Sequence, residues 1–162
     1  MSYPEPRYLG EDGLSNATFR PVAHEPEVRY VSGGTAHYLA TGDSTGGHFG
    51  LYRWEMAAPP GGPGPHFHRT ISESFYVLSG TIRLYDGERW IDGRPGDFMH
   101  VPEGGIHAFR NESGEPASML ILFAPGAPRE DYFETLARVG EGLELSDEEK
   151  TAFYLRHDTY WR

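Results

Sequence analysis

Residues 63–80 read PGPHFHRTISESFYVLSG, and this stretch decides the fold. The run PPGGPGP at 59–65 excludes a helix here, because proline removes a backbone donor and clashes with the preceding helical turn. His66 and His68 are two residues apart, so on a β-strand both side chains lie on one face. Glu73 follows five residues after His68, and an odd spacing on a straight strand would place it on the opposite face. The chain is therefore expected to turn or bulge within 69–72, so that an antiparallel neighbour returns Glu73 to the same side.

A fourth polar residue comes from a separate stretch. Residues 96–111 read GDFMHVPEGGIHAFRN, in which His107 follows the VPEGG turn on a later strand. Imidazole and carboxylate groups together suit a first-row divalent metal such as iron, nickel, cobalt, manganese or zinc. The chain has no cysteine, so nitrogen and oxygen atoms must hold any metal. His66, His68, Glu73 and His107 are thus predicted to bind one divalent transition metal per chain, which requires the sheet to curve closed.

Alternating apolar residues and turn signals continue on both sides of this region. They predict seven to nine short strands between residues 35 and 124, a pattern typical of an all-β sandwich or barrel. The segments 74–80 and 81–87 are predicted to form a hairpin-like pair around Ser79 and Gly80. The Asp86-Gly87 dipeptide predicts a further turn.

The chain divides into three parts. Residues 1–34 are rich in proline and weakly patterned, which predicts an extended arm. Residues 35–125 carry the strand pattern of the barrel. Residues 126–162 are expected to form a helical extension packed on the outside of the barrel.

Two short helices are predicted in this extension. The first has apolar residues at helical spacing, namely Tyr132, Phe133, Leu136 and Val139. The second begins at Ser146, where a serine followed by DEEK is typical of an N-cap with an acidic first turn.

Composition limits the class of protein. The length of 162 residues suits one domain, and the net charge of −10 argues against nucleic acid or an anionic membrane surface as a partner. No apolar run approaches the roughly 20 residues of a spanning helix, and no signal peptide is evident. A cytoplasmic location is expected. Aromatic residues make up 14% of the chain, which argues against disorder despite 21 glycines and 13 prolines.

These stretches resemble the two motifs of the cupin superfamily. The first motif is G-(x)5-H-x-H-(x)3,4-E-(x)6-G, and its leading glycine falls on Pro60, next to Gly61. Its other positions are matched by His66, His68, Glu73 and Gly80. The second motif is G-(x)5-P-x-G-(x)2-H-(x)3-N. All of its positions are matched, by Gly96, Pro102, Gly104, His107 and Asn111.

The resemblance is to the metal-binding monocupins, and especially to the quercetin 2,3-dioxygenase-like group. It covers residues 61–111 in the motifs and extends to about residue 125 in strand pattern; the segment 128–140 is similar to a phenylalanine-rich helix of that group. It implies a double-stranded β-helix (jelly-roll) barrel with His66, His68 and His107 as ligands. Glu73 would then be both ligand and general base. The resemblance also implies a homodimer, in which residues 1–34 could exchange strands.

The expected activity follows from an open metal. Four protein ligands leave one or two positions free, whereas structural zinc sites are closed and usually rich in cysteine. We expect a metal-dependent dioxygenase that uses O2 on a flavonol-like, catecholic or enolic small molecule. By strand parity the cavity wall would include Phe75, Val77 and Phe109. Two alternatives stay open: an isomerase, cyclase or lyase that uses the metal only as a Lewis acid, and a small-molecule-binding cupin without turnover.

Overall fold

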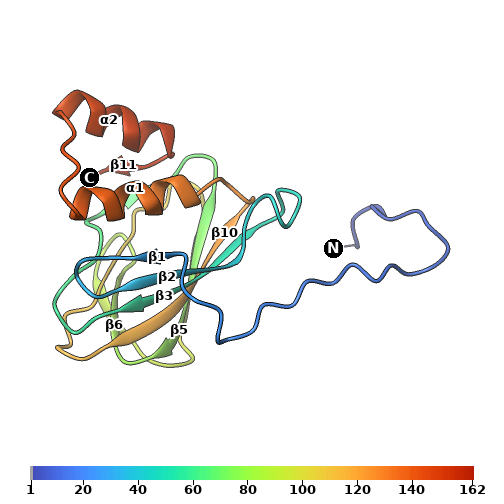
Figure 1. Cartoon of the computed structure of the whole chain (residues 1–162), viewed down its shortest axis with the longest axis horizontal. Coiled ribbons are helices and arrows are strands. Elements are labelled where there is room, and N and C mark those ends of the chain that lie inside the picture. The colour runs from blue at the N-terminus through green and yellow to red at the C-terminus, as the bar shows by residue number, and fades with distance from the viewer. Residues whose placement is uncertain (1) are drawn as a thin grey trace.

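The largest of the three sheets has six antiparallel strands. A computed structural model describes residues 2–162, and Figure 1 shows the strands gathered in one body with two helices over one end. The strand order is β1-β2-β3-β10-β5-β8. The bounds are β1 (Val28–Arg29), β2 (Thr35–Ala40), β3 (Gly50–Met56), β5 (Ser72–Ser79), β8 (Phe98–Val101) and β10 (Ala117–Ala124).

The remaining strands form two smaller sheets. One has the order β7-β6-β9 and the other pairs β11 with β4. Their bounds are β4 (His66–Phe67), β6 (Ile82–Tyr85), β7 (Trp90–Gly93), β9 (Ala108–Arg110) and β11 (Tyr160–Trp161). Isolated antiparallel bridges join Gly61 to Asn111 and His66 to His107, so the chain before and through β4 runs beside the chain that leads into β9. This is the expected double-stranded β-helix, although its described strands do not close into one continuously bonded barrel.

The predicted hairpin around Ser79 and Gly80 is wrong. β5 pairs with β10 and β8, whereas β6 pairs with β7 and β9. The chain crosses from one sheet to another at this point. Gly80 has φ +70, and a Cβ there would lie 2.6 Å from the carbonyl oxygen of Pro116. The crossing therefore requires glycine, as many tight turns do. The turn at Asp86 and Gly87 does join a hairpin, that of β6 and β7.

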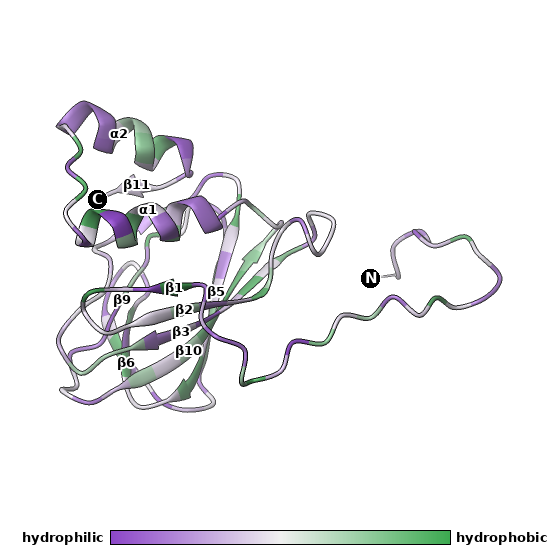
Figure 2. Cartoon of the chain, viewed as in Figure 1, coloured by the Kyte–Doolittle hydropathy of each residue, from purple (hydrophilic) through white to green (hydrophobic). Residues whose placement is uncertain are grey.

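The core lies between the sheets, and β10 runs through the middle of the largest one. From Met119 onward, alternate residues of β10 are buried, and Figure 2 shows apolar residues along the strands of the body. The almost completely buried apolar side chains are Ala36, Tyr52, Phe75, Val77, Ile82, Ala108, Met119, Ile121 and Phe123.

Both predicted helices are present. They are α1 (Glu130–Gly140) and α2 (Asp147–Arg156), and Ser146 caps α2 in a capping box with Glu149. The two helices lie over one end of the sheets, and the buried face of α1 packs onto the core. The ring of Phe133 lies 4.9 Å from that of Trp54, between ring centroids. Neither helix of the described chain is long and apolar enough to cross a bilayer.

The N-terminal part is extended. Residues 2–27 contain no strand or helix and lead away from the body in Figure 1, and pairing begins where β1 joins β2. At the other end, β11 returns from the helices and pairs with β4. The last residues of the chain therefore lie beside the segment that carries His66.

Candidate metal centre

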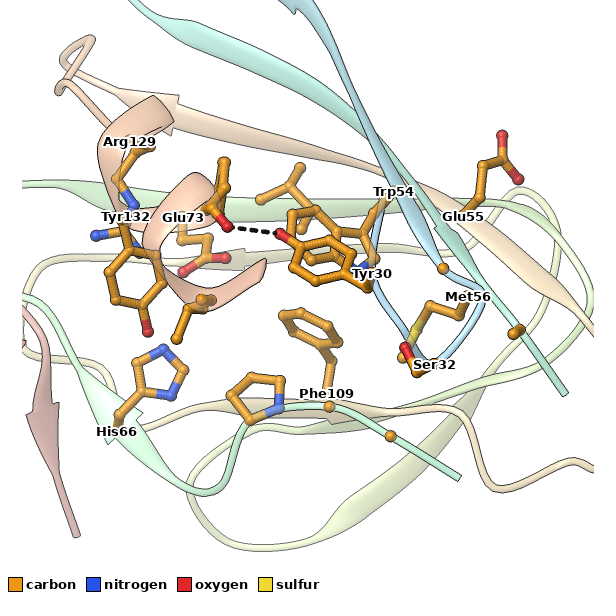
Figure 3. Close-up of a pocket in the computed structure, with 18 of the residues that line it drawn as sticks. Tyr30, Ser32, Trp54, Glu55, Met56, His66, Glu73, Phe109, Arg129 and Tyr132 are labelled. Atoms are coloured by element: carbon orange, nitrogen blue, oxygen red, sulfur yellow. Dashed lines mark hydrogen bonds between the residues drawn. The ribbon is translucent and has the colours of Figure 1, made fainter. Parts of the chain in front are cut away.

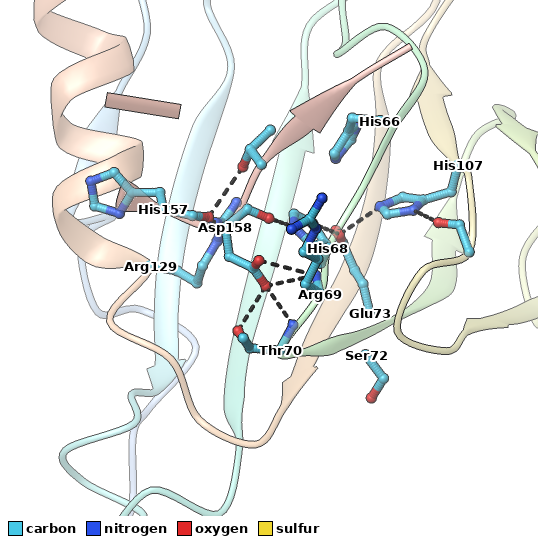
Figure 4. A network of polar contacts seen from close by, with 12 residues as sticks. His66, His68, Arg69, Thr70, Ser72, Glu73, His107, Arg129, His157 and Asp158 are labelled. Carbon is cyan, nitrogen blue, oxygen red and sulfur yellow. Dashed lines mark hydrogen bonds and ion pairs between the residues drawn. The ribbon is translucent and has the colours of Figure 1, made fainter. Parts of the chain in front are cut away.

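The structure brings His66, His68, Glu73 and His107 together. One ligand atom from each lies within 4.8 Å of those from the other three, and all four side chains are buried. His66 is on β4, His68 on the following turn and Glu73 on β5, while His107 directly precedes β9. Figure 4 shows these side chains converging from separate segments. The turn expected within 69–72 exists, but β4 pairs with β11 and not with β5.

Backbone carbonyl groups orient all three imidazoles. The Nδ1 atoms of His66 and His107 donate to the carbonyl oxygens of Gly64 and Gly105, each at 2.9 Å. His68 Nδ1 donates to the carbonyl oxygen of Asp158, 90 positions away in the sequence, at 2.6 Å. Because each Nδ1 is occupied, each Nε2 is the atom left to bind a metal, which is the usual arrangement of metal-binding histidines.

The Glu73 carboxylate lies between His68 and His107 in the cluster. Its Oε2 accepts from His68 Nε2 at 3.0 Å and from His107 Nε2 at 2.9 Å. Burial opposes ionisation of Glu73, but attraction to His107 and the two hydrogen bonds outweigh it and hold the pKa of this carboxyl well below its usual range. Burial lowers the pKa of His66 to about 4, which keeps that imidazole neutral. Three nitrogens and one carboxylate oxygen in this arrangement fit a divalent transition metal, which would replace the protons on Nε2.

Asp158 supports the site from the far end of the chain. Its carboxylate accepts hydrogen bonds from the backbone N–H groups of Arg69 and Thr70, at 3.0 and 2.8 Å, and from Thr70 Oγ1 at 2.7 Å. Its carbonyl oxygen accepts from His68, so one residue fixes both a ligand and the turn that follows it (Figure 4). No local pattern in the sequence indicates this role.

The C-terminal strand β11 packs beside His66. The ring of Trp161 lies 5.3 Å from that of His66, and Tyr160 stacks on Phe67 with the rings 5.1 Å apart. The N–H of Arg162 donates to the carbonyl oxygen of Pro65 at 2.9 Å. Phe67, between the two histidines, thus points away from the metal site and packs against the C-terminus.

Asn111 and Gly104 serve the backbone around the ligands. The Asn111 Nδ2 group donates to the carbonyl oxygens of Ala57 and Glu115, so the side chain links two backbone segments. The N–H of Gly104 donates to the carbonyl oxygen of His68 at 2.7 Å, which links the two motif segments.

A cavity of about 330 Å³ opens beside the cluster. His66 and Glu73 form part of its wall, and Phe109 lines it, as Figure 3 shows. Phe75 and Val77 are completely buried in the core and do not line it. All three side chains are buried, and strand parity does not distinguish a core position from the cavity wall.

Most of the cavity wall comes from outside the two motifs and is not predicted from the sequence. The chain before β2 contributes Tyr30, β3 contributes Trp54, and α1 with its N-cap contributes Arg129, Tyr132 and Phe133. Burial raises the pKa of Tyr132 to about 12, so its hydroxyl keeps its proton. The helical spacing in the sequence identifies the apolar face of α1, but not what this face covers.

Comparison with known proteins agrees with this geometry. Residues 54–123 match the family model described as the cupin domain. Over 77 residues, the chain is 35% identical to quercetin 2,3-dioxygenase of Bacillus subtilis (strain 168), an alignment that covers 48% of this chain and 22% of that protein. The chain spans 22% and 54% of the lengths of the two curated relatives that it matches.

Solved structures extend the likeness to most of the chain. The polyketide cyclase RemF from Streptomyces resistomycificus aligns with a TM-score of 0.56 and 25% identity, covering 69% of this chain and 81% of that one. KdgF from Halomonas sp. aligns with a TM-score of 0.61 over 72% of this chain and 99% of that one. Its identity is 16%, so this second likeness concerns the fold alone.

Proposed function

We propose that this chain, in which residues 54–123 match the cupin domain model, is a metal-dependent dioxygenase. The substrate would be a flavonol-like, catecholic or enolic small molecule cleaved with O2. One observation carries the proposal: three imidazole groups and one carboxylate converge at the wall of a cavity that several aromatic side chains line. The partial identity to the Bacillus subtilis quercetin 2,3-dioxygenase supports it.

The four residues His66, His68, Glu73 and His107 would hold the metal. A bound divalent transition metal would supply an open coordination position for an enolate or for O2, and a positive charge that polarises a carbonyl. Among the described residues, hydrogen bonds to the Glu73 carboxylate reach only Oε2. The second oxygen, Oε1, is therefore the atom that would accept the proton of a substrate hydroxyl, with Glu73 as general base.

The cavity suits a flat substrate. Trp54 and Phe109 lie on its wall with their rings 6.5 Å apart, and aromatic faces of this kind pack well against planar compounds. The volume of about 330 Å³ lies at the small end of ligand pockets, which favours one small molecule over a polymer.

Metal loading and oxygen uptake test the proposal. Protein purified without chelator would be analysed for metal and then assayed in an oxygen electrode with a panel of flavonols and catechols. Glu73→Gln should keep the fold and most of the metal but lose turnover. The exposed Glu88 in the β6–β7 turn offers a control, since Glu88→Gln should keep full activity. Oxygen uptake that is unchanged in Glu73→Gln would contradict the role of Glu73 as base.

A second candidate is a metal-dependent isomerase, cyclase or lyase. The likeness to the polyketide cyclase RemF favours it, since that alignment covers most of both chains. Product formation without oxygen consumption would select this reaction. Tight binding without any product would select a third function, that of a small-molecule-binding cupin.

We also propose a homodimer. The extended arm exposes large apolar side chains, among them Tyr3, Leu9 and Phe19, and the edge strand β8 exposes Phe98. Burial of such residues against a second copy would remove apolar surface from water. Sedimentation equilibrium tests this, and a monomer at high micromolar concentration would contradict it.

A further inference from the structure

Arg129 is a buried cation without a carboxylate partner. Its side chain is 4% exposed, and within the described chain no acidic group lies at ion-pair distance from it. Its Nη1 donates to the carbonyl oxygen of His157 at 2.7 Å, whereas its Nε is buried with no hydrogen-bond partner. A guanidinium stays charged at every physiological pH, so the protein holds a permanent positive charge here.

Aromatic rings compensate for part of this charge. The guanidinium carbon lies 4.1 Å from the ring centre of Tyr132 and 4.9 Å from that of Phe123. Such cation–π contacts are weaker than a buried ion pair, and an unpaired buried charge is strongly unfavourable. An anion is therefore the partner that Arg129 lacks.

The link to His157 does not account for the charge. This bond joins the segment before α1 to the C-terminal end of α2, and a single neutral N–H would be sufficient for it. The positive charge of the guanidinium contributes to binding only where a charged or polar group lies beside it. Arg129 lines the same cavity as Glu73 and His66, and Figure 3 shows these side chains around that space.

We propose that Arg129 is the anion-binding residue of the cavity, and that the substrate is an aromatic or cyclic compound carrying a carboxylate. The inference rests on the proposed function only in placing the substrate in the cavity beside the metal centre. The guanidinium binds the carboxylate, because its planar donors match the two oxygens of that group. The aromatic wall, with Trp54 and Phe109, holds the ring. The substrate is thus placed between Arg129 and the ligands, with its reacting part toward Glu73.

Binding of benzoate and benzamide to metal-free protein tests the proposal. The two probes have nearly the same shape and differ in charge, and without metal neither can bind through it. Isothermal titration should give about tenfold or greater preference for benzoate, since a hydrogen bond to a charged group contributes more than a neutral one. Arg129→Gln should lose this preference and Arg129→Lys should keep part of it. Arg138→Gln, at an exposed position of the same helix, should bind as the unaltered protein does.

The outcomes separate this proposal from the assignment of dioxygenase activity. Equal affinity of the unaltered protein for the two probes, or no benzoate binding at millimolar concentration, overturns the role of Arg129. So does a preference for benzoate that persists in folded Arg129→Gln. If circular dichroism shows that this variant does not fold, the unaltered protein and Arg129→Lys still decide. Failure of the dioxygenase assignment would appear as absent oxygen uptake, with anion binding intact.

Discussion

Replacing Asp158 by alanine should weaken metal binding, although this residue is no ligand. Its carboxylate holds the turn at Arg69 and Thr70, and its carbonyl oxygen holds Nδ1 of His68. Without the carboxylate the turn loses its acceptor. His68 would then sample orientations in which its Nε2 no longer points at the other ligands.

The expected size of the effect follows from the hydrogen bonds that the Asp158 carboxylate accepts. Asp158→Ala removes acceptors for the N–H groups of Arg69 and Thr70 and for the Thr70 hydroxyl, all within 3.0 Å. Hydrogen bonds to a partly exposed carboxylate contribute less than buried ones, so we expect a loss of about 2 kcal/mol in the free energy of unfolding. Residues that orient metal ligands typically change metal affinity by about 10- to 100-fold, and we expect a change in this range.

Competition with a chromophoric chelator measures the affinity, and thermal melting measures the stability. Asp86→Ala is a matched control, because Asp86 also accepts from two backbone N–H groups, those of Glu88 and Arg89, in a turn away from the metal centre. Asp158→Ala should differ from this control in metal affinity. If the two variants bind metal equally well, the positioning role assigned to Asp158 is refuted.

Three further predictions concern stability and metal. Phe133→Ala should lower the free energy of unfolding by about 3 kcal/mol, since its ring is buried between α1 and the sheet. Denaturant unfolding measures this loss, and the control Val139→Ala, on the exposed side of the same helix, should lose at most about 0.5 kcal/mol. Burial lowers the pKa of His157, so as the pH falls the unfolded chain binds a proton at this residue before the folded chain does. The free energy of unfolding that the protein has above about pH 6.5 therefore decreases at lower pH. Melting between about pH 7.5 and 5.5 should therefore show a smaller loss in His157→Gln than in the exposed control His24→Gln, and equal losses would disprove this origin. Chelation should lower the melting temperature, because a metal at 100 times its Kd contributes about 2.7 kcal/mol; a chelator effect of the same size in His107→Ala would show that the metal binds elsewhere.

Local patterns predict the features of this chain that arise from neighbouring residues. Ser146 and Glu149 form their capping box within one turn of helix, so the sequence is sufficient to identify it. The ligands are predictable for a related reason, since the motif spacings describe strand and turn geometry over short distances. The crossing at Gly80 is misread, because a turn signal reports a change of direction and not which strands then pair.

The sequence by itself therefore determines the fold class, the two helices and the four side chains expected to bind metal. Only the tertiary structure decides what surrounds them. Asp158 meets His68 across 90 positions of the chain, and Arg129 reaches the cavity because α1 packs over the end of the sheets. Neither contact has a periodic or compositional signature, because each depends on how separate elements pack once the apolar surface is buried.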